Sequence, residues 1–151
     1  LDSLIASTSE IILNLHHLKS LESFQLRGVA IAPKAYGYVF NPKLGIRDGL
    51  LVEYFEGENL EESLIKDALT YDEVAIIVDK VSVQMEVLYA KRAIHGDLKP
   101  HNVLYSKEAN GEISVKLIDF TSPTFNFDDT NAPRRNTPTR DWRAFSTTFK
   151  L

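Results

Sequence analysis

The sequence predicts an α+β fold in which short strands lie before and after a long amphipathic helix. Residues 71–93 carry apolar side chains at the 3.6-residue spacing of a helix, whereas residues 36–40 and 50–54 alternate as strands do. Asn110 and Gly111, between two apolar runs, are the strongest β-hairpin signal in the chain. Because 44% of the 151 residues are apolar, the chain can fold around one core.

Residues 8–21 are predicted to form the first helix. Either Thr8 or Ser9 can cap its N-terminus, and Glu10 lies in the first turn, where the helix dipole favours an acid. Apolar side chains then recur at helical spacing, so one face of this helix is expected to be buried.

A hairpin is predicted next. Pro33 ends one apolar run, and the strand over residues 36–40 begins after it. Residues 41–49 contain Asn-Pro and Asp-Gly pairs, which are typical of turns, and they lead into the strand over residues 50–54.

Two helices are predicted after this hairpin. Residues 59–68 have acids early and Lys66 late, as the helix dipole prefers. Residues 71–93 form the most strongly patterned helix, with Asp72 as its expected N-cap. Met85 lies on the apolar stripe of that helix and is expected in the core.

The C-terminal third is predicted to hold a hairpin, a loop and the start of a helix. Residues 103–105 and 113–118 are the expected strands of the hairpin. Residues 121–140 are rich in Pro, Thr, Asn, Asp and Arg and are predicted to be a mobile loop. A helix is expected from Asp141, with Trp142, the only tryptophan, as a core anchor.

Composition excludes several functional classes. The net charge of −4 argues against a general nucleic-acid binder, and no apolar run has the length of a membrane span. The absence of cysteine excludes disulfides and thiolate metal sites, and it permits an intracellular location, cytoplasmic or nuclear. Because the chain begins with Leu1 and lacks a basic signal region, we expect an internal start or a processed end.

One short polar stretch carries most of the chemistry. Residues 95–102 read His-Gly-Asp-Leu-Lys-Pro-His-Asn, and a second carboxylate, Asp119, closes a later apolar run. Phosphoryl transfer needs a carboxylate to orient the attacking hydroxyl, a cation on the transferred phosphate, and an amide and a carboxylate to hold Mg²⁺. The order of these groups favours that reaction.

This stretch resembles the catalytic loop and metal-binding segment of eukaryotic-type protein kinases, His-Arg-Asp-Leu-x-x-x-x-Asn and then Asp-Phe-Gly. The resemblance implies that Asp97 accepts the proton of the substrate hydroxyl and that Lys99 stabilises the transferred phosphate of ATP. It implies that Asn102 and Asp119 hold Mg²⁺. In the family the histidine, here His95, braces the loop.

Two positions depart from the family pattern. Gly96 replaces the arginine that, in many kinases, pairs with a phosphorylated activation loop, so control by that route is not expected. Thr121 replaces the glycine after Asp-Phe, and its β-branched side chain is expected to stiffen the segment without removing a metal ligand.

The resemblance implies a truncated protein-kinase-like fold over residues 1–151. Residues 1–52 would be an N-lobe remnant, made of helix αC and one hairpin, with Glu10 as the acid that pairs with a lysine in other kinases. Residues 53–57 would be the hinge. Residues 58–151 would be the first part of the helical C-lobe: αD, αE, the catalytic loop, a hairpin, the activation segment and the start of αF, whose aspartate braces the catalytic loop and corresponds to Asp141.

The resemblance also implies a nucleotide site. Val52 would be the gatekeeper, Glu53 would offer its carbonyl to the adenine, and Phe55 its N–H and carbonyl. Leu104 would pack beneath the adenine. Read without the resemblance, this stretch is an edge strand that runs into a loop.

Three functions remain open on the sequence. Lys99 and Pro100 favour a protein kinase that acts on a serine or threonine hydroxyl, whereas His95 and Gly96 favour a small-molecule kinase of the aminoglycoside type. The chain contains neither a glycine-rich phosphate loop nor an identifiable strand lysine, which favours a pseudokinase or scaffold. Since the later C-lobe helices are also missing, the exposed face is expected to meet a protein partner or to self-associate.

Overall fold

The computed structural model describes residues 19, 25–26, 29–91, 93–120, 138–146 and 149. The helix predicted over residues 8–21, with Glu10, lies outside the described residues except for Lys19. The greater part of the loop predicted over residues 121–140 also lies outside them.

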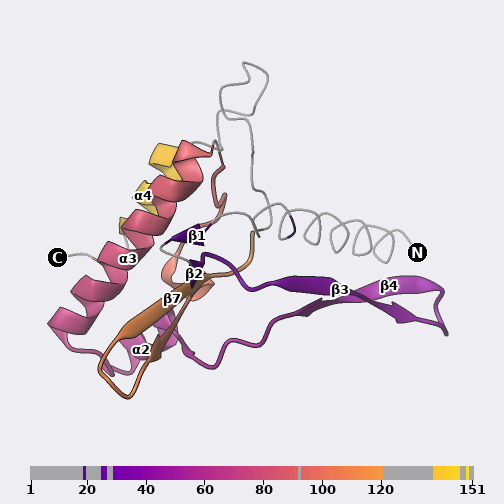
Figure 1. Ribbon diagram of the computed structural model, residues 1–151, viewed down its shortest axis with the longest axis horizontal. Coiled ribbons are helices and arrows are strands. Elements are labelled where there is room, and N and C mark those ends of the chain that lie inside the picture. The colour runs from indigo at the N-terminus through magenta and orange to yellow at the C-terminus, as the bar shows by residue number, and fades with distance from the viewer. Residues whose placement is uncertain are drawn as a thin grey trace.

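The described chain forms three small antiparallel sheets and three α-helices (Figure 1). The strands pair as β1 (Gln25–Leu26) with β2 (Val29–Ala30), β3 (Ala35–Asn41) with β4 (Ile46–Val52), and β5 (Glu58–Asn59) with β6 (Val103–Lys107) and then β7 (Ile113–Leu117). The helices are α2 (Leu60–Ile65), α3 (Tyr71–Ala90) and α4 (Pro138–Ser146), with a 3₁₀ turn, η1 (Pro100–Asn102). This combination of helices and small sheets agrees with the predicted α+β class.

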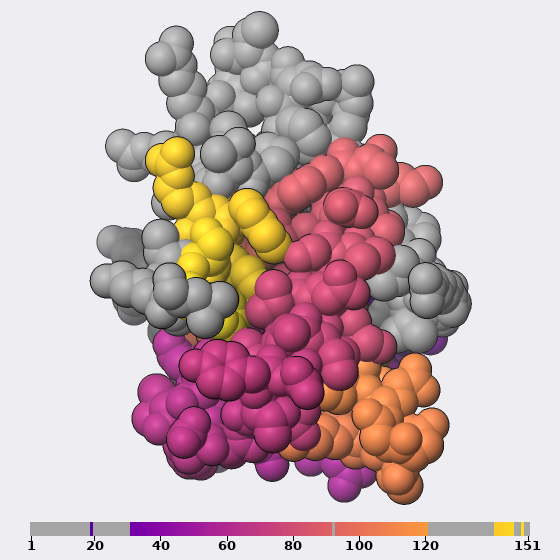
Figure 2. Space-filling view, turned by 90° about the vertical axis from the view of Figure 1, so that its left-hand side faces the viewer, coloured from indigo at the N-terminus to yellow at the C-terminus, as the bar shows by residue number. Residues whose placement is uncertain are grey.

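The core lies between α3 and the three-stranded sheet. The β3–β4 hairpin projects away from this body, whereas α4 lies alongside α3 (Figures 1 and 2). Helix α3 turns an apolar stripe toward β6 and β7, and the core side chains that these three elements contribute are Ile77, Val81, Met85, Leu88, Val103, Tyr105, Ile113, Val115 and Leu117. The burial of Met85 confirms its predicted core position. Removal of this apolar surface from water provides the main stabilisation of the fold.

The N-terminus of α3 is capped by Thr70, and the prediction that Asp72 is the cap was wrong. The Thr70 hydroxyl accepts the backbone N–H of Glu73 at 3.2 Å, and the Glu73 carboxylate accepts the backbone N–H of Thr70 at 2.8 Å. This reciprocal pair satisfies two donors that a helix start leaves without partners. Asp72 lies two residues after the cap, in the first turn, where a carboxylate interacts favourably with the positive end of the helix dipole.

Replacing Thr70 with alanine is expected to lower the free energy of unfolding by about 1 kcal/mol, because it removes the acceptor for the Glu73 N–H. Urea unfolding followed by circular dichroism measures the change. Replacing Thr70 with serine, which keeps the hydroxyl, should retain most of the stability. Equal losses of unfolding free energy in the alanine and serine variants would show that the Thr70 hydroxyl makes no measurable contribution to stability.

Several predicted boundaries were wrong by a few residues. Strand β4 begins at Ile46 rather than at residue 50, because the turn is completed earlier: the Asn41 side chain accepts the N–H groups of Lys43 and Leu44. Helix α2 is shorter than predicted, ending at Ile65. Helix α4 begins at Pro138, inside the predicted loop.

The prediction that Trp142 anchors the core was wrong. Its side chain is 41% exposed, whereas Phe145 on the same helix is fully buried. An apolar hollow of about 760 Å³ lies between α2, α3 and α4, and Trp142 and Phe145 both line it.

Among the described residues, no helix is both long enough and apolar enough to cross a membrane.

Candidate active site

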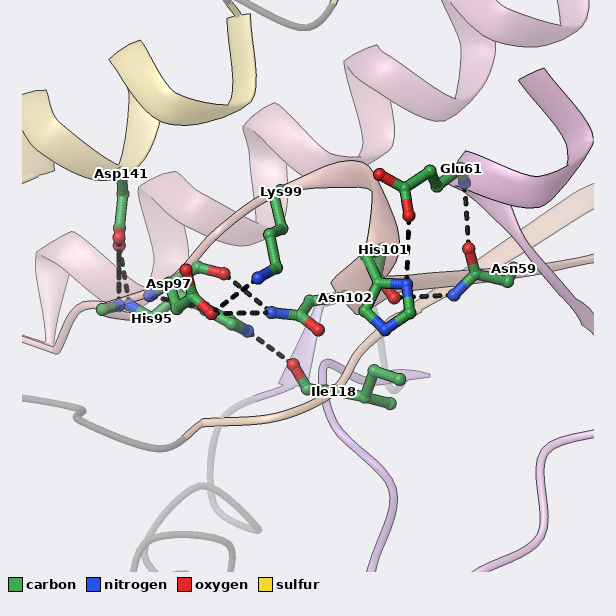
Figure 3. Close-up of polar contacts among 10 residues, drawn as sticks. Asn59, Glu61, His95, Asp97, Lys99, His101, Asn102, Ile118 and Asp141 are labelled. Carbon is green, nitrogen blue, oxygen red and sulfur yellow. Dashed lines mark hydrogen bonds and ion pairs between the residues drawn. The ribbon is translucent and has the colours of Figure 1, made fainter. Parts of the chain in front are cut away.

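The segment between α3 and β6 brings together the two predicted catalytic residues, Asp97 and Lys99, and the predicted metal ligand Asn102 (Figure 3). The Lys99 ammonium lies 3.2 Å from the Asp97 carboxylate. The Asn102 amide donates to the Asp97 backbone carbonyl at 2.8 Å and reaches its carboxylate at 3.4 Å. Asn102 is buried, whereas the side chains of Asp97 and Lys99 are about half exposed, at 48% and 46%. Both the carboxylate and the ammonium are therefore accessible to a substrate, and the buried Asn102 amide holds Asp97 in place.

His95 braces this segment from below, as predicted. Its Nε2 lies 2.7 Å from the Ile118 carbonyl, its Nδ1 accepts the Asp97 backbone N–H at 3.2 Å, and its ring lies 4.4 Å from that of Phe120. Burial lowers the pKa of His95, which favours a neutral ring that carries its proton on Nε2. With both nitrogens engaged, His95 fixes the backbone and is not placed to act as a base.

Asp141 braces the same segment from α4, and its predicted role is confirmed. Its carboxylate accepts the backbone N–H of His95 at 2.8 Å and that of Gly96 at 3.0 Å. Burial raises the pKa of Asp141, against the opposing effect of these hydrogen bonds. Gly96 has a φ of +90°, a conformation that glycine adopts at little cost and other residues resist.

Asp119 lies two residues after the end of β7, on a segment that is hydrogen-bonded to Asn102. The N–H of Ile118 donates to the backbone carbonyl of Asn102 at 2.9 Å, so the two predicted metal ligands lie on chain segments that are bonded together. Asp119 itself is exposed and has a φ of +61°. A left-handed backbone conformation costs a residue other than glycine about 1 kcal/mol or more. Residues in this conformation are found most often at functional sites.

The donor set fits magnesium. Asn102 and Asp119 offer an amide oxygen and a carboxylate, and Mg²⁺ is commonly held by one or two such groups together with water and phosphate oxygens. The amide nitrogen of Asn102 makes the bonds to Asp97, and its oxygen takes part in neither of them. In the part of the chain that the structure describes, no three His, Cys, Asp or Glu residues gather as a metal site of their own.

The predicted nucleotide residues lie where β4 leads to β5. Val52 ends β4 and is 39% exposed, and Glu53 and Phe55 lie in the predicted hinge, residues 53–57. Leu104 is half-buried on β6, opposite Lys116 of β7. Both Glu53 and Phe55 contact Lys116, so these side chains reach the sheet that carries Leu104.

Sequence reasoning missed three contacts that hold the site. The amide of Asn59 donates to the backbone carbonyl of His101 at 2.6 Å, and the imidazole of His101 lies 3.1 Å from the Glu61 carboxylate (Figure 3). These two contacts join the start of α2 to the predicted catalytic loop. The third contact is the ion pair of Lys116 with Glu53. The partners lie about forty to sixty residues apart in the chain, so no local sequence pattern indicates any of the three contacts.

Residues 39–145 match the family model described as the protein kinase domain. The chain belongs to this family. The chain is 30% identical over 108 residues to the probable serine/threonine-protein kinase fnkB of Dictyostelium discoideum, which covers 71% of the chain and 19% of that relative.

Two further relatives are also serine/threonine-protein kinases by name. A serine/threonine-protein kinase of Myxococcus xanthus (pkn2) is 34% identical over 71 residues, covering 47% of the chain and 8% of the relative. Human serine/threonine-protein kinase ULK1 is 34% identical over 77 residues, covering 47% of the chain and 7% of the relative. The chain thus spans less than a fifth of the length of each of these curated relatives.

Proposed function

We propose that this kinase-family chain takes part in transferring the γ-phosphoryl group of ATP to a serine or threonine hydroxyl of a protein. The observation that carries the proposal is the cluster around Asp97, whose carboxylate lies within ion-pair distance of the Lys99 ammonium and within hydrogen-bond reach of the Asn102 amide. The match to the protein kinase domain and the names of its relatives support the same reaction class.

Each residue has a separate role in the proposed reaction. Asp97 orients the substrate hydroxyl and accepts its proton as the oxygen attacks the γ-phosphorus. Lys99 leaves its ion pair with Asp97 and stabilises charge on the transferred phosphate. Asn102 and Asp119 would hold Mg²⁺, which when bound neutralises charge on the phosphates.

The finer domain assignment is part of the proposal. Residues 1–52 are assigned to the N-lobe remnant, residues 53–57 to the hinge and residues 58–151 to the C-lobe part. Helices α2, α3 and α4 correspond to αD, αE and αF. The Asp141 contacts to the catalytic segment support the αF assignment, since they are those implied by the resemblance.

The test is a thermal melt of the chain with ATP, with and without Mg²⁺. A ligand that binds only the folded state raises the midpoint, and at about one hundred times its Kd it adds about 2.7 kcal/mol of stability. We expect a rise that requires Mg²⁺ and is lost when Asp119 is replaced with alanine. Asp119 is exposed, so this variant should melt as cooperatively as the original chain without ligand.

The other outcomes decide against the proposal. A cooperative melt that ATP and Mg²⁺ leave unchanged would favour a pseudokinase or scaffold that has kept the motif without its ligand. A shift of the same size in the Asp119→Ala variant would contradict the assigned metal ligand. Glu108→Ala, which removes an exposed acid from the β6–β7 turn, is the matched control and should keep the full shift.

A further inference from the structure

Lys116 is a buried lysine on β7 that none of the roles above uses. Its side chain is 11% exposed. It lies directly opposite Leu104 in the β6–β7 register. Side chains that face each other across an antiparallel pair lie on the same face of the sheet, so Lys116 lies beside the residue expected beneath the adenine.

The ammonium of Lys116 has two partners, and both belong to the predicted hinge. It lies 2.8 Å from the Glu53 carboxylate and 5.5 Å from the centroid of the Phe55 ring. Lysine is almost never buried without a partner, and an ammonium near an aromatic face is attracted by it. These contacts therefore set the place of Lys116, and in turn it holds two hinge side chains against β7.

Glu53 is also held from the side of the β3–β4 hairpin. Its carboxylate accepts the Lys34 backbone N–H at 3.1 Å, and its own N–H donates to the Lys34 carbonyl at 2.7 Å. The hydrogen bond from Lys116 is the main cause that lowers the pKa of Glu53, so its carboxylate stays charged near neutral pH. The Glu53 side chain thus connects the start of the β3–β4 hairpin to the three-stranded sheet.

The far end of the predicted hinge is also tightly placed. A Cβ added at Gly57 would lie 2.4 Å from the Tyr105 carbonyl oxygen and 2.6 Å from the Phe55 ring. Only glycine fits there without displacement of the chain. The hinge is therefore packed against β6 at Gly57 and against β7 through Glu53 and Phe55.

We infer that Lys116 is a positioning residue for nucleotide binding, which acts through the Glu53 carboxylate and the Phe55 ring to fix the hinge backbone that the adenine would meet. This inference rests on the proposed function. Adenine recognition by a hinge uses main-chain groups, whose position must be set by side chains elsewhere. If these main-chain groups are already fixed before the nucleotide binds, less conformational entropy is lost on binding.

The experiment compares two ligands of the chain, ATP and inorganic tripolyphosphate, each with Mg²⁺, by titration calorimetry. Replacing Lys116 with methionine should weaken ATP binding by roughly five- to tenfold, the effect of weakening one or two hydrogen bonds. Tripolyphosphate has no adenine, so its affinity should stay within about twofold of the original value. A general loss of structure would weaken both ligands, so the difference separates positioning from folding.

Three further single variants make the comparison specific. Lys116→Arg keeps the charge and the reach to Glu53, so this variant should keep the ATP affinity. Glu53→Gln removes the charge from the more exposed partner and should reproduce the ATP-selective loss, with little further loss when combined with Lys116→Met. Lys107→Met is the matched control, because it breaks an ion pair on the same hairpin, with Glu73, that does not touch the hinge.

The outcomes distinguish this inference from the proposed function. An original chain that binds neither ATP nor tripolyphosphate would overturn the proposed function, and the inference with it. If the original chain binds ATP and the Lys116→Met and Glu53→Gln variants bind it equally well, the inference is overturned and the proposed function stands. Equal weakening of both ligands by Lys116→Met would also overturn it, since the effect would then be structural.

Discussion

Replacing Asp141 with alanine is expected to lower the free energy of unfolding by about 2–4 kcal/mol. The carboxylate accepts the backbone N–H groups of His95 and Gly96 in a buried position. Removing it leaves two donors without a partner, each of which costs about 1–3 kcal/mol, with some relief as water enters. Urea unfolding measures the loss, and the same variant should bind Mg²⁺ and ATP less tightly because the catalytic segment is no longer fixed.

Asparagine at position 141 is the matched comparison. Its amide oxygen can still accept at least one of the two N–H groups, so its loss should be intermediate between alanine and the original residue. Glu86→Ala removes an exposed acid from α3 and should change stability by less than about 0.5 kcal/mol. An alanine variant as stable as the Glu86 variant would refute the bracing role.

Replacing Asp97 with asparagine is expected to reduce phosphotransfer by about 10²–10⁴-fold, the usual contribution of a general base. Its side chain is 48% exposed and makes its contacts at 3.2 and 3.4 Å. Loss of the charge should therefore change the free energy of unfolding by less than about 1 kcal/mol. A phosphotransfer assay with a serine-containing protein, run together with urea unfolding, separates the two effects.

The control for this variant is Asp79→Asn, an isosteric change at an exposed acid of α3. It should leave both phosphotransfer and stability as they were. Unchanged turnover in the Asp97 variant would contradict the mechanism, whereas a large loss of stability would show that the charge of Asp97 holds the segment together. Retention of ATP binding by the Asp97 variant would place the defect in the chemical step.

The sequence predicted the elements whose signals are local. The apolar stripe of α3, the hairpin around Gly111 and the polar segment before β6 each depend on residues close together in the chain. For the same reason the cluster of Asp97, Lys99 and Asn102 could be predicted: a short loop cannot take its members far apart. The predicted ends of helices and strands were less accurate, because neighbouring residues can each serve as a cap or a turn residue, as Thr70 and Asp72 can.

The sequence by itself determined the polar segment of residues 95–102 and the helix that precedes it, because spacing along the chain specifies both. Only the tertiary structure decided which neighbours meet. Trp142 and Phe145 lie on one short helix, yet packing against α3 buries only Phe145. Lys116 and Glu53 are 63 residues apart, and Asp141 lies 46 residues from His95. Contacts at such separations follow from how the elements pack, and no pattern within a single element encodes that packing.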